Sequence, residues 1–333
     1  MFILYLTVSG YAAEQGGKDI TEKRFLILPF GFYTTDTSVG LGVFSQYAKA
    51  EENKIFGNAV YTFKNQFMLI VSADFKNDRF VFNNFFKIKD YYSEFYGYGN
   101  NTDKDDPLKY RFFQIDNTFE FGKMISEKIK ISAAVNNFLH IPDDHKIQLG
   151  YYNYGGGNFY NGIGGSAEYK NISGDFFRDG FFMKALFLIY PEIIANPNQF
   201  FVCDFEAGFF KSLNKSAFNT LLSLRSTAAD VHPEKLSRIG GTKVLRGYPD
   251  NRFIDYNMAA LQTQYDFRIY KDFSGCVFIG CAEVFEMPDE ITRLKTAFGA
   301  GIMYKYKNLI MRFEAATSPE KNIEIIITGN RVY

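Results

Sequence analysis

The residue types that most often carry chemistry are few in this chain, and they do not cluster. The 333 residues include three cysteines and three histidines: Cys203, Cys276, Cys281, His140, His145 and His232. None has the Cys-x-x-Cys or Cys/His spacing of a metal site. The sequence has no Gly-x-Ser-x-Gly element, no phosphate loop followed by a helix and no convincing carboxylate pair. We therefore expect no enzymatic activity, no cofactor and no metal.

The stretch GGTKVLRGYPDNRF, residues 240–253, has the most distinctive chemistry in the sequence. Its centre is Leu245-Arg246-Gly247-Tyr248, with an arginine that needs an acceptor if it is buried. A buried guanidinium is costly unless a carboxylate pairs with it, and Asp266 offers a bidentate acceptor. The alternative is an exposed Tyr-Pro-Asp-Asn turn with Arg246 in water. The first interpretation predicts a buried pair between Arg246 and Asp266.

The segments on both sides alternate apolar and polar residues with a period of two. In residues 199–212, Phe201, Phe205 and Phe209 share one face, and Asp204 and Glu206 share the other. A soluble sandwich also alternates. The apolar faces, however, run for about nine to eleven residues, the length of a tilted strand that crosses a bilayer. Charged residues at mid-strand are typical of a polar lumen.

Sixteen segments of this kind are predicted strands, an even number as in single-chain bacterial barrels. They are 24–33, 37–48, 54–64, 66–76, 79–97, 108–123, 128–140, 161–171, 180–190, 199–212, 216–228, 256–271, 275–286, 293–307, 308–317 and 321–333. Connections after even strands are mostly short, with 172–179 as the exception, whereas the long ones follow odd strands. Outer-membrane barrels have short periplasmic turns and long extracellular loops. The sequence therefore predicts an all-β, 16-stranded antiparallel transmembrane β-barrel with a periplasmic N-terminus.

The composition agrees with a protein surrounded by lipid. Aromatic residues make up 18% of the chain, with 38 Phe and 23 Tyr, which is more than a soluble core needs. Mean hydropathy is only −0.17, and no apolar run reaches the ~18 residues of a membrane helix. A closed barrel is the other structure that satisfies its backbone in lipid. Lys plus Arg equals Asp plus Glu, 37 each, so no net charge attracts nucleic acid.

The N-terminus predicts a targeting segment. The opening MFILYLTVSGYAAEQ has a short apolar run followed by Tyr-Ala-Ala, as at the end of a signal peptide. It lacks a basic start, and an apolar tail is the alternative. We expect a signal over residues 1–13, a short segment over 14–23 and one barrel domain over 24–333.

The strand count places residues 229–255 between strands 11 and 12, and here the chain resembles the Omp85 superfamily. These are the BamA/TamA-like outer-membrane proteins, also called bacterial surface antigen D15 barrels. Their sixth extracellular loop carries a Val-Arg-Gly-Phe/Tyr motif and folds into the lumen. Here that motif is LRGY, followed in order by DFR, VFIGCAEVF, TAFGAGIMYKY and a terminal IEIIITGNRVY. EFYGYGNN at 94–101 is similar to another strand end of the family.

The resemblance implies roles for particular residues. The loop-6 motif is Leu245, Arg246, Gly247 and Tyr248, and its lumen contacts are Asp266 and Arg268. In the family the arginine also pairs with an aspartate on strand 13, where this chain has Gly280. A C-terminal β-signal that the assembly machinery recognises comprises Ile325, Ile327, Gly329 and Tyr333.

The resemblance also implies function. It predicts an outer-membrane barrel that assists protein assembly or translocates polypeptides or lipids. It works alone or with a periplasmic partner and unfolded clients, and the barrel itself is monomeric. No periplasmic POTRA domain fits before the first strand, so we expect a POTRA-less form. Pro29 in strand 1 predicts a weak seam between strands 1 and 16. The alternatives are a structural surface antigen or passive pore, and the barrel partner of a separately encoded enzyme.

Overall fold

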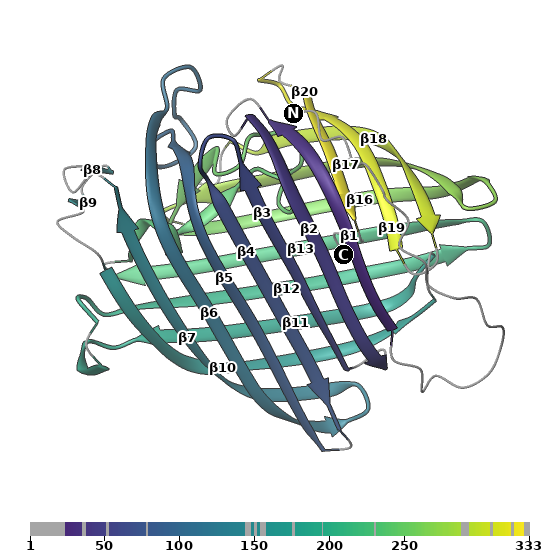
Figure 1. Ribbon diagram of the computed structural model, residues 1–333, viewed down its shortest axis with the longest axis horizontal. Coiled ribbons are helices and arrows are strands. Elements are labelled where there is room, and N and C mark those ends of the chain that lie inside the picture. Colours follow the sequence, from purple (N-terminus) through teal and green to yellow (C-terminus); the bar gives the residue numbers. More distant parts are fainter. Residues whose placement is uncertain are drawn as a thin grey trace.

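Sixteen antiparallel strands form one sheet that curls into a barrel (Figure 1). The computed structural model describes residues 24–34, 38–50, 53–77, 79–143, 148–149, 152–153, 158–174, 177–194, 196–229, 231–287, 293–306, 309–320 and 323–329. No helix in these ranges is long and apolar enough to cross a membrane. The predicted fold class is confirmed. The predicted signal over 1–13 and the segment 14–23 lie outside the described residues, as does Tyr333.

The strands of the sheet follow chain order. They are β1 (Arg24–Thr34), β2 (Ser38–Ala50), β3 (Asn53–Thr62), β4 (Phe67–Lys76), β5 (Phe80–Phe95), β6 (Leu108–Ser126), β7 (Ile129–Pro142), β10 (Asn158–Ser173), β11 (Asp179–Tyr190), β12 (Phe200–Leu213), β13 (Ser216–Ala229), β16 (Asn257–Tyr270), β17 (Phe273–Phe285), β18 (Lys295–Tyr306), β19 (Leu309–Thr317) and β20 (Ile323–Gly329). Two short ribbons, β8 (Gln148–Leu149) with β9 (Tyr152–Asn153) and β14 (Ser237–Ile239) with β15 (Phe253–Asp255), lie outside this sheet. Two single-turn 3₁₀ helices, η1 (Glu192–Ile194) and η2 (Pro233–Lys235), complete the elements.

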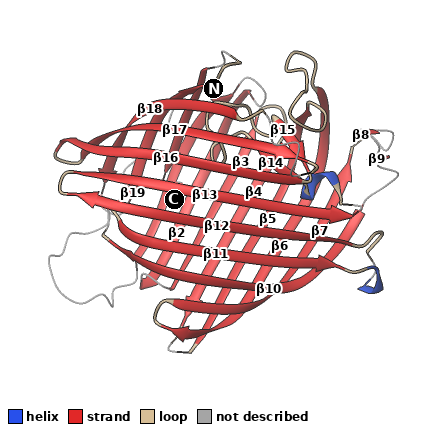
Figure 2. Ribbon diagram, turned by 180° about the vertical axis from the view of Figure 1, so that it is seen from behind, coloured by secondary structure: helices blue, strands red, loops and turns tan. Residues whose placement is uncertain are grey.

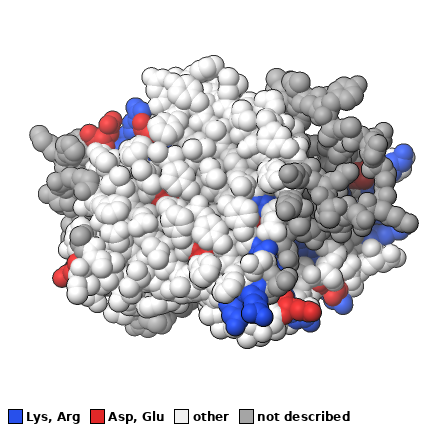
Figure 3. Space-filling view, turned by 60° about the horizontal axis from the view of Figure 1, so that its bottom comes forward, with Lys and Arg blue, Asp and Glu red and all other residues white. Residues whose placement is uncertain are grey.

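The alternation of residues along each strand separates a lipid-facing wall from the lumen. In β17, Val277 and Ile279 point outward and are exposed, whereas Cys276 and Phe278 point inward and are buried. The outward side chains of the neighbouring strands are also large and apolar, and one face of the wall carries almost no charge (Figure 3). An outer surface of this kind suits lipid, because charged side chains are costly at bilayer depth.

The two ends of the barrel differ in the length of their connections (Figure 2). At one end β12 and β13 are joined by residues 214–215, and β16 and β17 by residues 271–272. At the other end, residues 96–107 join β5 to β6, and residues 230–256 join β13 to β16. We call these the short-turn end and the long-loop end.

Candidate functional site: the loop inside the barrel

Residues 231–256, here called the inner loop, connect the eleventh and twelfth strands of the sheet and fold into the barrel. The loop has its own ribbon, in which β14 pairs with β15 from Ser237 opposite Asp255 to Ile239 opposite Phe253. Figure 2 shows this ribbon within the outline of the barrel wall. The inward fold that the sequence predicts is therefore confirmed.

Two glycines allow the loop to turn and to approach the wall. Gly240 has φ of +120°, and a Cβ there would lie 1.9 Å from the carbonyl oxygen of Pro249. Gly247 has φ of +114°, and a Cβ there would lie 2.9 Å from the carbonyl oxygen of Thr317. Side chains rarely adopt these backbone angles, and neither position has room for one. Gly247 therefore lets the Arg-Gly-Tyr segment lie directly on β19.

The apolar side chains of the inner loop pack on the lumen wall. Leu245 is fully buried and Tyr248 is 2% exposed, in one cluster with Met258, Ala260, Ala282, Val284 and Ala297 of β16 to β18. The rings of Tyr248 and Phe253 meet edge to face at 5.4 Å. Burial of a leucine contributes ~1.5–3 kcal/mol, so this contact favours the inward position of the loop.

Arg246 is 1% exposed and makes a fork of contacts with two strands. Its Nη1 donates to both carboxylate oxygens of Glu314 on β19, each at 3.0 Å, and its Nη2 donates to Oε1 of Gln264 at 3.0 Å. The guanidinium also lies 3.6 Å from the ring centroid of Phe278. The loop arginine is thus paired, desolvated and stacked.

A second arginine completes this buried cluster. Arg312 donates to Glu314 and, at 3.0 Å, to Oε1 of Gln264. The amides of Gln264 and Asn219 each donate to Asp266 at 2.6 Å. Two arginines and two carboxylates balance the charge, as buried ions require. Cys276 also donates its thiol to Glu314 at 3.4 Å.

Arg246 has a carboxylate partner that the sequence did not indicate. The sequence favours Asp266, which joins the cluster through Gln264, and both oxygens of Glu314 accept from Nη1 of Arg246. A Cβ at Gly280 would lie 3.0 Å from Cγ of Gln262 and 3.1 Å from Cδ1 of Leu245, so the inner loop packs closely on β17 at this position.

The remaining predicted residues lie apart from this cluster. Arg268 is exposed at the short-turn end, where its guanidinium is 5.6 Å from the ring of Phe177, so it is not a lumen contact of the loop. Ile325, on β20, is partly buried. Gly329 ends the described part of β20, and nothing is described of the side chain of Ile327.

The inner loop has a second anchor, formed by Arg252, that the sequence did not reveal. Its Nε and Nη2 donate to the two carboxylate oxygens of Glu320 at 3.0 and 2.8 Å. Its Nη1 and Nη2 donate to Oγ1 and the carbonyl oxygen of Thr102 at 2.6 and 2.8 Å. Thr102 belongs to residues 96–107, here called the mouth loop. Arg252 therefore joins the mouth loop, the inner loop and the turn between β19 and β20.

The mouth loop extends across the barrel at the long-loop end. The amide of Gly99 donates to the carbonyl oxygen of Ile254 in β15 at 2.8 Å. Asn100 donates to Glu283 at 3.0 Å, and Lys295 donates to the carbonyl oxygen of Asn100 at 2.8 Å. The mouth loop therefore bridges from β5 and β6 to β17 and β18 above the inner loop.

The base of the inner loop is fixed by polar contacts and aromatic packing. Lys235 donates to Asp116 and Asn136, each at 3.1 Å. His232 accepts the amide of Glu234 on Nδ1 at 3.2 Å, and its ring lies 5.0 Å from that of His140. Burial and nearby positive groups hold the pKa of His232 well below its usual value of 6.5. Burial raises the pKa of Glu234, but Arg238 and Lys89 outweigh it and leave the pKa well below 4.5.

Known structures with the same fold come from the bacterial outer membrane. No protein-family model matches the sequence, and no curated protein is detectably similar to it. A structure of BamA from Haemophilus ducreyi lacking POTRA domains 1–3 superposes with a TM-score of 0.63 at 12% identity, covering 92% of this chain and 70% of that one. CdiB from Escherichia coli gives 0.63 at 11%, covering 98% and 66%. CdiB from Acinetobacter baumannii gives 0.58 at 11%, covering 92% and 58%. The chain thus has the fold of the Omp85-superfamily barrels, with the sixth connection at the long-loop end folded into the lumen.

Proposed function

We propose that this barrel resides in the bacterial outer membrane and assists the assembly or translocation of polypeptides or lipids. It acts alone or with a separate periplasmic partner that presents unfolded clients. The long-loop end faces the exterior, and the N-terminus lies in the periplasm. The observation that supports this proposal is the inner loop, which is held in the lumen by Arg246 on Glu314.

A passive pore is the other candidate, and the inner loop argues against it. A loop that is buried in the lumen and joined to a mouth loop obstructs a free aqueous path. Obstructing loops have a cost, because ordering each residue of a loop requires ~1–2 kcal/mol of conformational entropy. The buried contacts of Leu245, Arg246 and Tyr248 offset that cost.

Depletion of the protein in its own cell tests the assembly role. If the barrel assists assembly, depletion should lower the amounts of several other outer-membrane proteins, measured by quantitative proteomics of isolated membranes. Re-expression of the unaltered chain should restore them, whereas Arg246→Ala should not. Unchanged amounts after depletion would contradict the assembly role.

Conductance in a planar bilayer tests the obstructed lumen independently. Removing the guanidinium frees the loop from β16 and β19, so Arg246→Ala should conduct more than the unaltered barrel. Lys54→Ala is a suitable control, because Lys54 forms a half-exposed ion pair with Asp74 near the short-turn end. Equal conductance of all three proteins would show that the loop does not obstruct ion flow.

A further inference from the structure

Exposed lysine and arginine side chains gather at the short-turn end of the barrel. We call them the basic rim, and they lie in or beside five successive turns, from the β4–β5 turn to the β16–β17 turn. They are Arg79, Lys123, Lys128, Lys170, Lys211, Lys215 and Lys271. The inner loop uses none of them. Figure 3 shows Lys and Arg side chains gathered at the lower right of the view, beside a nearly uncharged wall.

Lys123 shows where these charges lie relative to the lipid. It follows Phe119 and Phe121 in the outward-facing row of β6, and both of those side chains are exposed. Its neighbours on the adjoining strands are Phe80, 47% exposed, and Ile131, 52% exposed. Lys123 therefore stands near the end of the lipid-facing row, between Phe121 and the exposed Ile125, in an apolar setting.

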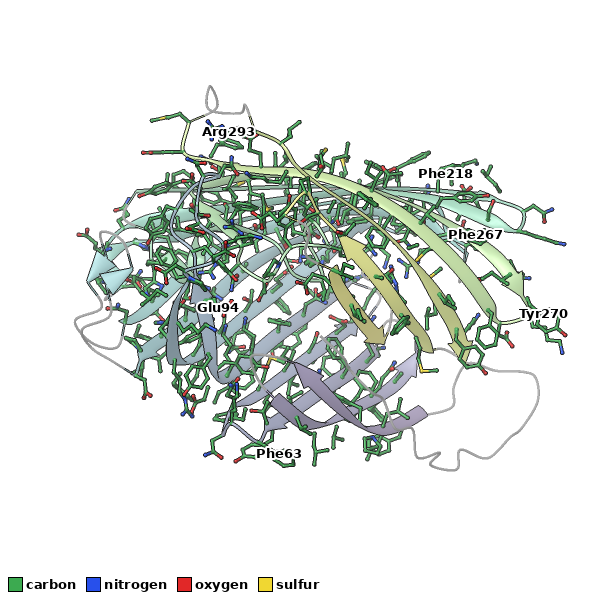
Figure 4. All side chains as sticks on the ribbon, turned by 90° about the horizontal axis from the view of Figure 1, so that it is seen from above. Phe63, Glu94, Phe218, Phe267, Tyr270 and Arg293 are labelled. Atoms are coloured by element: carbon green, nitrogen blue, oxygen red, sulfur yellow. The ribbon has the colours of Figure 1, made fainter. Side chains whose placement is uncertain are left out.

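Other members of the basic rim repeat this arrangement beside aromatic rings. Lys211 follows the exposed Phe209 in the outward row of β12. The ammonium of Lys271 lies 5.1 Å from the ring of Tyr270, which is 62% exposed. Figure 4 shows Tyr270 with Phe218 and Phe267 on the outside of this end. Aromatic rings of this kind sit at the level of lipid headgroups, so the adjacent ammonium groups lie at the same depth.

The basic rim has more cations than carboxylates, since its turns contain the exposed Glu127 and Asp272 beside the seven basic residues. Within the described residues, Lys211 pairs with Asp179 at 3.1 Å, and no ion pair within 4 Å is found for the other six members. At the long-loop end the charges are mixed, because Asp103, Asp105 and Asp106 are exposed beside the exposed Lys104 and Lys109. The short-turn end of an electrically neutral chain thus carries a local excess of positive charge.

We propose that the basic rim binds the phosphate groups of anionic phospholipids in the leaflet at the short-turn end. Each lysine near an anionic membrane surface favours binding by a factor of about five, and the effect weakens as salt screens it. An acidic protein would suit the charge but not the position, since Lys123 lies in the lipid-facing row. This inference is independent of the activity proposed above, because it requires only the fold.

Bound lipid can be counted directly on the intact chain. The protein is reconstituted in nanodiscs that contain equal amounts of phosphatidylcholine and phosphatidylglycerol. It is then released from the nanodiscs under mild conditions, and native mass spectrometry counts the lipid molecules that remain bound. The rim variant is Lys123→Gln, Lys128→Gln, Lys215→Gln and Lys271→Gln together. The control variant is Lys64→Gln, Lys104→Gln, Lys109→Gln and Lys243→Gln, which makes the same change in net charge away from the rim. Circular dichroism and heat-modifiable gel mobility verify that each variant is folded.

The unaltered protein and the control variant should retain several-fold more phosphatidylglycerol than phosphatidylcholine, and the rim variant should retain the two nearly equally. The preference of the unaltered protein for phosphatidylglycerol should also shrink in 0.5 M salt. This salt measurement is the test if the rim variant does not fold. Equal retention by the unaltered protein would overturn the proposal and favour an acidic protein as the occupant. The proposal would also be overturned if the control variant lost the preference for phosphatidylglycerol as fully as the rim variant.

Discussion

At the scale of single residues, the central feature is a carboxylate held between two arginines. Glu314 is fully buried and accepts from Arg246 and Arg312. Removing one partner from a buried ionic group typically costs ~3–5 kcal/mol, because it leaves an uncompensated charge. Asp266 lies one residue farther along this network and accepts from the neutral amides of Gln264 and Asn219. The two carboxylates should therefore differ in importance.

We predict that Glu314→Gln destabilises the barrel by ~3–5 kcal/mol and that Asp266→Asn costs ~1–3 kcal/mol. The first substitution strips both arginines of their shared carboxylate, whereas the second changes an acceptor of amide hydrogen bonds. The measurement is the urea midpoint of unfolding in detergent micelles. Arg246→Lys is the control, because lysine keeps the positive charge but lacks the forked guanidinium group. If Asp266→Asn lowered the urea midpoint more than Glu314→Gln, Asp266 would be the more important partner of Arg246, as the sequence predicts.

At the scale of elements, the inner loop is held at two points along one stretch of the wall. Arg246 pairs with Glu314 and Arg252 pairs with Glu320, and in both pairs the partners are 68 residues apart. The loop therefore runs beside residues 314–320 in the same direction. The first pair holds the loop in the lumen, and the second ties it to the mouth loop.

Arg252→Ala should release the mouth loop and leave the lumen anchor in place. Hydrogen bonds to charged groups contribute ~1.5–3 kcal/mol, so amides in residues 96–107 should exchange about tenfold faster or more. Hydrogen–deuterium exchange with peptide mass spectrometry measures this directly. Peptides of β19 serve as the internal control and should change little. Unchanged exchange in the mouth loop would show that Gly99 and Asn100 suffice to hold it.

The base of the inner loop should lose stability in acid. The folded state depresses the pKa of His232 below its unfolded value of 6.5, so the folded protein binds fewer protons than the unfolded one. Its contribution is therefore fully present above pH 6.5 and is lost as the pH falls below that value. Glu234 adds a second loss below pH 4.5, since its pKa is also lowered.

The urea midpoint should thus fall between pH 7.5 and pH 5, and His232→Asn should reduce that fall. Asparagine keeps an acceptor for the amide of Glu234 but does not titrate. His140, Lys235 and Arg238 also face His232, so His140→Gln is the matched control for the other histidine. An unchanged pH dependence in His232→Asn would assign the effect to another group.

At the scale of the whole molecule, the strands differ in how firmly they are held. Among the described residues, β1 and β20 are the two ends of the sheet order, with one hydrogen-bonded neighbour each, and β1 contains Pro29. A strand with one paired neighbour has fewer protected amides, and a proline removes a donor from the ladder. The first and last strands of the sheet are thus its least supported elements.

We expect amides of β1 and β20 to exchange faster than those of β6 and β7 in the same barrel. Exchange by mass spectrometry in nanodiscs provides the comparison within a single sample. Pro29→Val should slow exchange in β1, because valine restores a backbone donor and suits a strand. Uniform exchange over all sixteen strands would contradict the weak seam that the sequence predicts.

The amino-acid pattern alone was enough to predict the strand count and the apolar and polar faces, because both depend on local period and on the lengths of connections. The inward fold of the inner loop was predicted from the resemblance of its Arg-Gly-Tyr motif to a known family. The tertiary structure decided which groups meet. Arg246 and Glu314 lie on elements far apart in sequence, and they meet only because the curled sheet brings β19 beside the inner loop. Arg252 was missed for the same reason, since Thr102 and Glu320 become neighbours only when the sheet curls.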